Sequence, residues 1–191
     1  MSALHHLYRH PLLSREEVEV ICQAHQRISF RKGDFLLQPG AIANAYYCLE
    51  KGLVRTYVYD FNGTDITIGF AGNNELAIDV VSLFNRVPSV EYCQALTDCD
   101  CWVIDLATFQ ELYHSIKGFS EWGRGWMSAS LFALKQRSIA MITDSASERY
   151  EQLQRERPQV LQQAPLKHIA SYLGITDTSL SRIRKELVRG H

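Results

Sequence analysis

The sequence has no apolar run near the roughly 18 residues that a membrane-spanning helix requires. Its first residues show neither an apolar signal segment nor a small-residue cleavage site. Its five cysteines form neither a Cys-x-x-Cys pair nor a zinc-finger spacing. These absences argue against a membrane protein and a disulfide-stabilised secreted domain. They predict a cytoplasmic chain with reduced thiols.

Histidine is missing from the part of the chain that reads as β-structure. All seven histidines lie before residue 26 or after residue 113. A histidine-ligated metal inside a β-barrel therefore cannot be built from this sequence. A Ser-His-Asp arrangement and a glycine-rich phosphate loop are also missing. We accordingly expect no enzymatic activity, no metal and no resident cofactor.

What is present between residues 27 and 106 is a series of short runs rich in β-branched and aromatic residues, separated by turn-forming pairs. This spacing predicts an all-β sandwich or barrel. We expect a tight hairpin at Asn62-Gly63, with positive φ at both residues. Ser14 and Glu17 form a capping-box pattern, which predicts a short helix ahead of the strands.

Helical spacing returns after residue 106 and is most extended between residues 118 and 143. The apolar stripe of this segment packs either on its own β domain or on a second copy of the same helix. The segment is long relative to the surface that one β domain offers, so we favour a dimer interface. Its candidate residues form a near-heptad repeat headed by two tryptophans: Trp122, Trp126, Met127, Leu131, Leu134 and Met141.

Residues 164–187 have the spacing of a helix-turn-helix, with Gly174 between the two expected helices. Leu180, Ile183 and Leu187 share one face of the second helix, which should pack on the first. The opposite face and the N-terminal end carry groups that suit the major groove of DNA. We expect DNA contacts from Thr176, Asp177, Thr178, Ser179, Ser181, Arg182 and Lys185.

The charge of the chain is unevenly distributed. Residues 159–191 contain five lysines and arginines against two acidic residues, in a chain whose formal net charge is -1. Solvated surface charges would explain the charge alone, but the glycine turn and the two-helix register favour a DNA-reading helix.

Several stretches together carry a family resemblance. They are KGD (32–34), YYCLEKGLVRTYVYDFNG (46–63), SERYEQLQRERP (147–158) and IASYLGITDTSLSRIRKEL (169–187). With these, nearly the whole chain resembles the Crp/Fnr superfamily of bacterial transcription regulators. The resemblance implies an α+β fold with an N-terminal, jelly-roll-like double-stranded β-roll of cyclic-nucleotide-binding type (1–117), a long dimerisation helix (118–143) and a C-terminal helix-turn-helix (144–191).

The resemblance also implies the partners of the protein. They are double-stranded DNA with a palindromic operator, a second copy of the chain, and RNA polymerase. The positions that match the base-reading residues of the family are Asp177, Thr178 and Arg182, and Arg182 keeps an arginine where the resemblance implies a guanine contact.

One departure from the family concerns the cyclic phosphate. Cyclic-nucleotide-binding members hold it with Gly-Glu-Leu and Arg-Ser-Ala stretches, where IDVVSL (78–83) and PSVEY (88–92) stand here. We therefore predict no tight cAMP binding, with Arg86 left open as a substitute phosphate ligand. An unidentified small-molecule effector is expected at Asp79, Val80, Ser82, Tyr92, Gln94, Leu134 and Lys135.

A second departure is that the sequence ends shortly after the expected DNA-reading helix, so we expect the two-stranded wing of the family to be absent. Cys99 and Cys101 share one face of an expected strand, a pattern more typical of small apolar residues than of a redox pair. A different class of function also stays open: a ligand-sensing or protein-interaction module of the same fold that no longer binds DNA. The basic face of the last helix favours the regulator.

Overall fold

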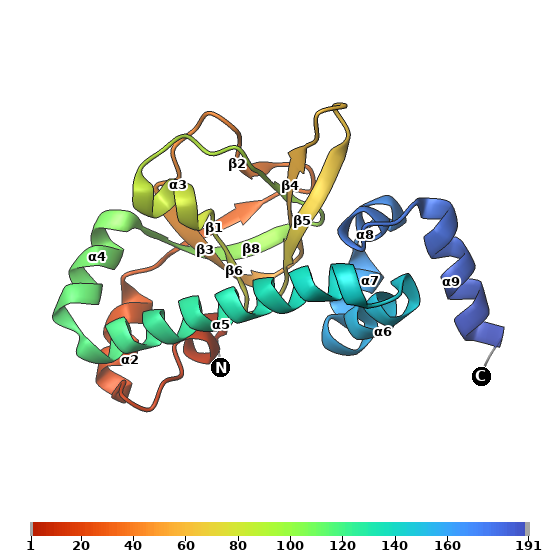
Figure 1. Cartoon of the computed structure of the whole chain (residues 1–191). Coiled ribbons are helices and arrows are strands. Elements are labelled where there is room, and N and C mark those ends of the chain that lie inside the picture. The colour runs from red at the N-terminus through yellow and green to blue at the C-terminus, as the bar shows by residue number, and fades with distance from the viewer. Residues whose placement is uncertain (1, 190–191) are drawn as a thin grey trace.

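Two four-stranded antiparallel sheets form the N-terminal part of the chain in the computed structural model, which describes residues 2–189 and their side chains as far as Leu187 (Figure 1). The first sheet, sheet A, has the order β1 (Gln26–Phe30), β8 (Cys99–Asp105), β3 (Ala45–Lys51) and β6 (Leu76–Ala77). The second, sheet B, has the order β2 (Phe35–Leu37), β7 (Tyr92–Ala95), β4 (Val54–Tyr59) and β5 (Asp65–Ala71). The expected β-roll within an α+β fold is confirmed.

The inner faces of the two sheets meet in one apolar cluster, because side chains alternate along each strand. The cluster includes Leu49, Val54, Cys93 and both Cys99 and Cys101. Burial raises the pKa of the Cys101 thiol to about 12 and also raises the pKa of Cys99. Both thiols therefore stay protonated at neutral pH and serve as small packing groups.

The hairpin between β4 and β5 differs from the expected tight turn. Gly63 has a φ of 78°, whereas Asn62 has a negative φ, so the prediction for Asn62 was wrong. The loop is longer than two residues: the amide of Gly63 donates to the carbonyl oxygen of Asp60, and the Asp60 carboxylate accepts from the amides of Asn62 and Thr64. Only the glycine position of such a loop requires positive φ.

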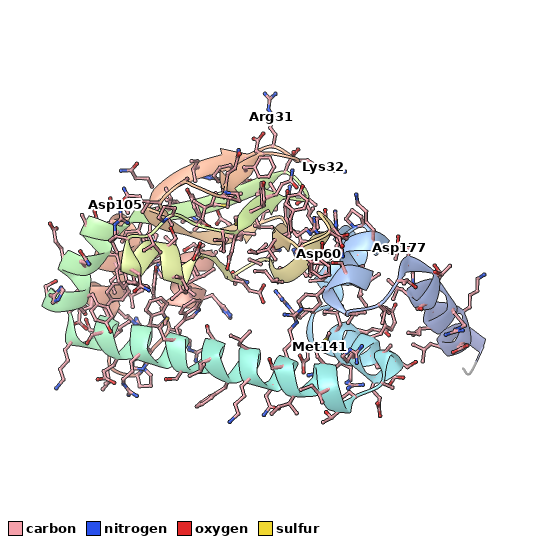
Figure 2. All side chains as sticks on the ribbon, turned by 45° about the horizontal axis from the view of Figure 1, so that its top comes forward. Arg31, Lys32, Asp60, Asp105, Met141 and Asp177 are labelled. Carbon is pink, nitrogen blue, oxygen red and sulfur yellow. The ribbon has the colours of Figure 1, made fainter. Side chains whose placement is uncertain are left out.

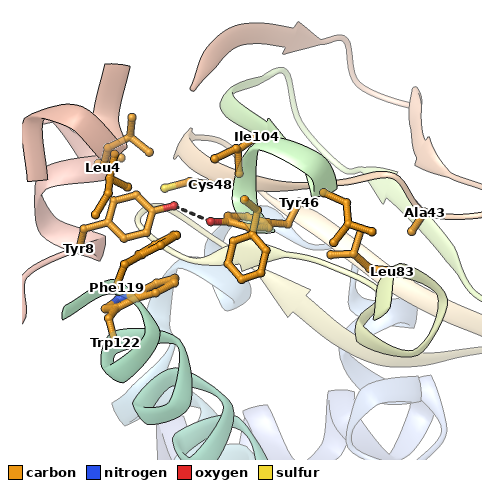
Figure 3. Close-up of a cluster of buried hydrophobic side chains, with 13 residues drawn as sticks. Leu4, Tyr8, Ala43, Tyr46, Cys48, Leu83, Ile104, Phe119 and Trp122 are labelled. Atoms are coloured by element: carbon orange, nitrogen blue, oxygen red, sulfur yellow. Dashed lines mark hydrogen bonds between the residues drawn. The ribbon is translucent and has the colours of Figure 1, made fainter. Parts of the chain in front are cut away.

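A second apolar cluster lies between sheet A and the N-terminal helices (Figure 3). Helices α1 (Ala3–Leu7), α2 (Arg15–Gln23) and α4 (Leu106–Ser115) surround it. The capping box of Ser14 and Glu17 at the start of α2 is confirmed. The hydroxyl of Tyr8 lies 2.9 Å from that of Tyr46 and 2.8 Å from Nε2 of His25, so the buried hydroxyl groups of both tyrosines are hydrogen-bonded.

The long helix α5 (Lys117–Thr143) runs along the roll from this cluster to the C-terminal domain (Figure 1). Trp122 is 8% exposed, stacks on Phe119 and donates from its Nε1 to the carbonyl oxygen of Leu7 at 2.8 Å. Trp126 packs against the same cluster. Trp122 is therefore part of the core of its own chain, and its assignment to a dimer interface was wrong, whereas Trp126 is half-buried and its assignment stays a prediction. The reason is geometric: nine residues at about 100° each place Trp122 on the helix face opposite Leu131.

The C-terminal domain is helical and contains α6 (Ala146–Glu156), α7 (Pro158–Gln163), α8 (Leu166–Tyr172) and α9 (Asp177–Arg189). Pro158 ends the expected helix before it and also occupies the first turn of α7, where its missing N–H costs little. Within residues 2–189, no strand follows β8, and no helix combines the length and apolar character of a membrane span.

Candidate nucleic-acid interface and sensor pocket

The turn between α8 and α9 is built from its glycine and from a cap. Gly174 has a φ of 69°, which a side chain would strain, and the amide of Ile175 donates to the carbonyl oxygen of Ala170 at 3.0 Å. Thr176 precedes α9, and its hydroxyl oxygen accepts from the amide of Ser179 at 3.2 Å. Thr176 therefore caps the N-terminus of α9 by binding the main-chain amide of Ser179.

The two faces of α9 differ as the sequence predicted. Leu180 is 0% and Ile183 is 6% exposed, and they pack in one core with Ile169 and Leu173 of the preceding helix. The opposite face is exposed and carries Asp177, Thr178, Ser181, Arg182 and Lys185.

This exposed face is free to meet a partner. Within the described side chains, Arg182, Arg184 and Lys185 form no ion pair. The helix lies at the end of the molecule away from the roll, and Figure 2 shows Asp177 at its start. Short hydroxyl groups near the N-terminus followed by cationic side chains fit base edges and phosphates.

A pocket of about 480 Å³ opens in the β-roll, lined mostly by apolar side chains. Of the expected effector residues, only Asp79 lines it. Leu134 and Lys135 are exposed on α5 and are not part of its wall. Gln94 is also outside the wall, and its side-chain amide group donates to the carbonyl oxygen of Gly33. The pocket brings together residues that the sequence did not single out, namely Phe35, Leu36, Leu37, Gln38, Ala41, Ile42, Ala43, Asn44, Ala45, Tyr47, Ala77, Ile78 and Cys93.

Val80, Ser82 and Tyr92 also lie outside the pocket wall, so these effector assignments find no support in its geometry. Val80 begins the short helix α3 (Val80–Asn85), and the Ser82 hydroxyl is engaged by the amide of Ala43 and the carbonyl oxygen of Val87. Tyr92 stacks on Tyr57 of the neighbouring strand, with ring centroids 4.7 Å apart.

The polar groups beside the pocket are acidic. Asp79 is 8% exposed, and its carboxylate accepts from the amide of Ser82 at 2.9 Å and from the hydroxyl of Ser89 at 2.6 Å. Burial and the nearby charge of Asp79 raise the pKa of Glu91 to about 7. The Arg86 guanidinium donates to the carbonyl oxygen of Ala43 at 2.6 Å and so links the residue after α3 to the segment before β3. This set lacks the free arginine that a cyclic phosphate requires.

Among curated protein sequences no match is found. A family model of the cyclic nucleotide-binding domain matches residues 27–115. Solved structures match the whole fold. FixK2 from Bradyrhizobium japonicum has a TM-score of 0.75 at 17% identity, covering 87% of this chain and 85% of its own. The catabolite activator protein of Thermus thermophilus has a TM-score of 0.60 at 18% identity, covering 99% and 88%. A transcriptional regulator of the Crp/Fnr family from Eubacterium rectale has a TM-score of 0.68 at 17% identity, covering 96% and 88%.

These matches agree with the two parts of the molecule described above. The family model covers the β-roll and α4, and the structural matches extend over the long helix and the C-terminal helices. Residues 27–115 are similar to the cyclic nucleotide-binding domain, and the chain as a whole has the fold of the solved Crp/Fnr structures that it matches.

Proposed function

We propose that the protein is a sequence-specific DNA-binding transcription regulator of Crp/Fnr type, with a β-roll that senses an effector other than cAMP. The observation that carries the proposal is the exposed face of α9, which presents hydroxyl groups and exposed cationic side chains on a helix-turn-helix whose other face is buried. Such a protein would act in the cytoplasm, on palindromic operators and with RNA polymerase as a partner. Its units would be residues 1–117, 118–143 and 144–191.

A homodimer is the form that a palindromic operator requires, because two reading helices must meet two half-sites about 34 Å apart. Helix α5 supports this form. Its outer face exposes Leu131, Leu134 and Ile142 to 62%, 61% and 86%, an apolar stripe that water disfavours. Met127 extends the stripe toward the N-terminus of α5, and Met141 lies beside Ile142 at its other end. A second copy of α5 would bury it, as heptad-spaced positions pack in a coiled coil.

The first test is selection of binding sites from random duplex DNA by the purified protein, repeated at two salt concentrations. A palindromic consensus is the expected result and would give the half-site spacing. Binding that falls with salt but shows no consensus would contradict sequence-specific reading. A protein that retains no duplex would instead fit a ligand-sensing module without DNA binding.

Arg182 and Lys185 should contribute differently to DNA binding, Arg182 to sequence preference and Lys185 to affinity for any duplex. Arg182→Ala should cost about 1–3 kcal/mol on the selected site and relax the preference at one base pair, because arginine binds guanine with two hydrogen bonds. Lys185→Ala should weaken selected and random duplexes about equally, because a phosphate contact carries no sequence information. Titration of both variants against both duplexes measures this. Equal losses on the two duplexes for Arg182→Ala would contradict its reading role.

Cyclic AMP should not bind tightly to the roll. The carboxylates of Asp79 and Glu91 lie where a cyclic phosphate would need positive charge, and Arg86 is engaged by main-chain oxygen. Isothermal titration calorimetry with cAMP should show no saturable heat at micromolar ligand. Arg86→Gln serves as the control, because it should leave the result unchanged. Micromolar affinity would overturn this prediction, and its loss in Arg86→Gln would identify Arg86 as the phosphate ligand.

A further inference from the structure

Strand β5 lies at the free edge of sheet B, so one row of its main-chain groups has no neighbouring strand. Helix α8 of the C-terminal domain supplies partners for two of them. The amide of Thr67 donates to the hydroxyl oxygen of Ser171 at 2.9 Å. The same hydroxyl donates to the carbonyl oxygen of Asp65 at 3.4 Å. Ser171 therefore makes two of the hydrogen bonds that a neighbouring strand would otherwise make with β5.

Two arginines continue this coverage along the same edge. Arg137 of α5 donates to the carbonyl oxygen of Ile68 at 3.2 Å and to that of Tyr172 at 3.1 Å. Its guanidinium also lies 4.2 Å from the centre of the Tyr172 ring. Arg157 donates to the carbonyl oxygen of Phe70 at 3.0 Å. Arg137 thus joins three elements, because it extends from the long helix and binds both the sheet edge and α8.

Apolar packing accompanies these hydrogen bonds. The rings of Phe70 and Tyr172 have centroids 5.3 Å apart. Three residues of the roll, Leu53, Phe70 and Leu96, belong to the same apolar cluster as the core of the helix-turn-helix. The C-terminal domain therefore completes its core with side chains of the sensor, and separating the two would expose apolar surface on both.

Buried charge lies directly beneath the contact. Arg55 of β4 is 1% exposed and pairs with Asp65 and the hydroxyl of Thr67. His168 of α8 is 7% exposed and lies close enough to Arg55 to be influenced by its charge. Burial, and then the charge of Arg55, lower the pKa of His168 to about 4, so this histidine is neutral at physiological pH. Undocking α8 would hydrate the guanidinium of Arg55, which is buried in the docked state.

We propose that this contact is a latch, formed by Ser171, Arg137 and Arg157 on the edge of β5, and that Ser171 and Arg137 are positioning residues for DNA reading. The proposal rests on the proposed function. The latch fixes α8, and α9 packs on α8, so the latch sets the orientation of the reading face. That face lies outside the contact and stays exposed. The latch therefore orients α9 and does not cover it. Because Arg137 belongs to α5 and binds α8, a movement of α5 would also move α8.

Hydrogen–deuterium exchange of the full-length protein tests the latch without DNA. In Ser171→Ala and in Arg137→Gln, amides of residues 64–71 should exchange about 3- to 10-fold faster, which corresponds to the loss of one hydrogen bond. The matched controls are Ser138→Ala, at an exposed position of α5, and Arg155→Gln, whose ion pair to Glu151 lies within α6. Neither control should change exchange at β5. Unchanged exchange in both latch variants would refute the latch.

Titration of the same variants with duplex DNA tests the positioning role. Binding to the selected operator should weaken about 3- to 10-fold, because the correctly oriented state is less populated, and binding to random duplex should not change. Tighter operator binding, or unchanged operator binding despite faster exchange, would overturn the positioning role. A wild-type protein that binds no duplex would refute the proposed function, whereas the exchange measurement would still decide whether the latch exists.

Discussion

Replacing Leu131 by aspartate should convert the protein to a monomer and lower its affinity for the selected operator about 100-fold or more. Leu131 is 62% exposed at the middle of the apolar stripe of α5. A carboxylate at this position would be buried against its own copy across a two-fold axis, so two like charges would be desolvated together. A monomer reads one half-site and loses the avidity of the second, which is worth about 10²–10⁴ in affinity. Analytical ultracentrifugation and operator titration measure the two effects.

The matched control for this experiment is Gln136→Asp. Gln136 is exposed on the same helix, and five residues at about 100° each place it on the side away from Leu131. This variant should stay dimeric and bind the operator like the wild type. A Leu131→Asp protein that remains a dimer at micromolar concentration would show that the stripe is not the interface. A monomer with full operator affinity would show that DNA reading does not require pairing.

Replacing Asp65 by alanine should destabilise the fold by about 3 kcal/mol, the lower end of the range for removing one partner of a buried ion pair. Arg55 is 1% exposed, so its guanidinium would lose its counter-ion without gaining full hydration. The Asp65 side chain is 35% exposed, so some water can enter the vacated space and limit the loss. Urea denaturation at one fixed protein concentration measures the change, since a dimer would make stability depend on concentration.

Two further variants test whether the loss of stability comes from the unpaired buried charge of Arg55. Glu111→Ala removes an exposed carboxylate from α4 and should change stability by less than about 0.5 kcal/mol. The double variant Arg55→Met with Asp65→Ala should recover most of the loss, because no unpaired charge then remains in the interior. A double variant as unstable as Asp65→Ala alone would show that lost packing, and not the unpaired guanidinium, determines the cost.

The helix-turn-helix was predictable because its determinants are local. The glycine of the turn, the cap at Thr176 and the apolar spacing of Leu180 and Ile183 lie within a short segment of chain, and the structure places them as expected. Helix periodicity fixes which side chains share a face without knowledge of the rest of the fold. The exposed face of α9, and with it the candidate DNA contacts, could therefore be predicted from the sequence.

The pocket of the roll was less predictable, because its wall brings residues 35–47 together with residues 77–79 and Cys93, which are distant in sequence. Of the seven expected effector residues, Asp79 alone lines it, while the wall is built largely from residues 35–45. Trp122 of α5 shows the same limit. Its spacing fits a heptad seam, but Leu7 and Tyr8 of the N-terminal segment pack on it, and only the packed structure shows which face of a long helix is already occupied.

The sequence by itself determined the order of the parts, the position of the last helix with its polar face, and the departure from the Arg-Ser-Ala stretch, since each depends on residue type and short-range spacing. Tertiary structure alone decided how the parts are joined. Ser171, Arg137 and Arg157 carry no sequence pattern that links them to β5, yet all three bind its free edge. The free main-chain N–H and C=O groups of an edge strand need hydrogen-bond partners. Which residues supply these partners is determined only when distant segments of the chain pack together.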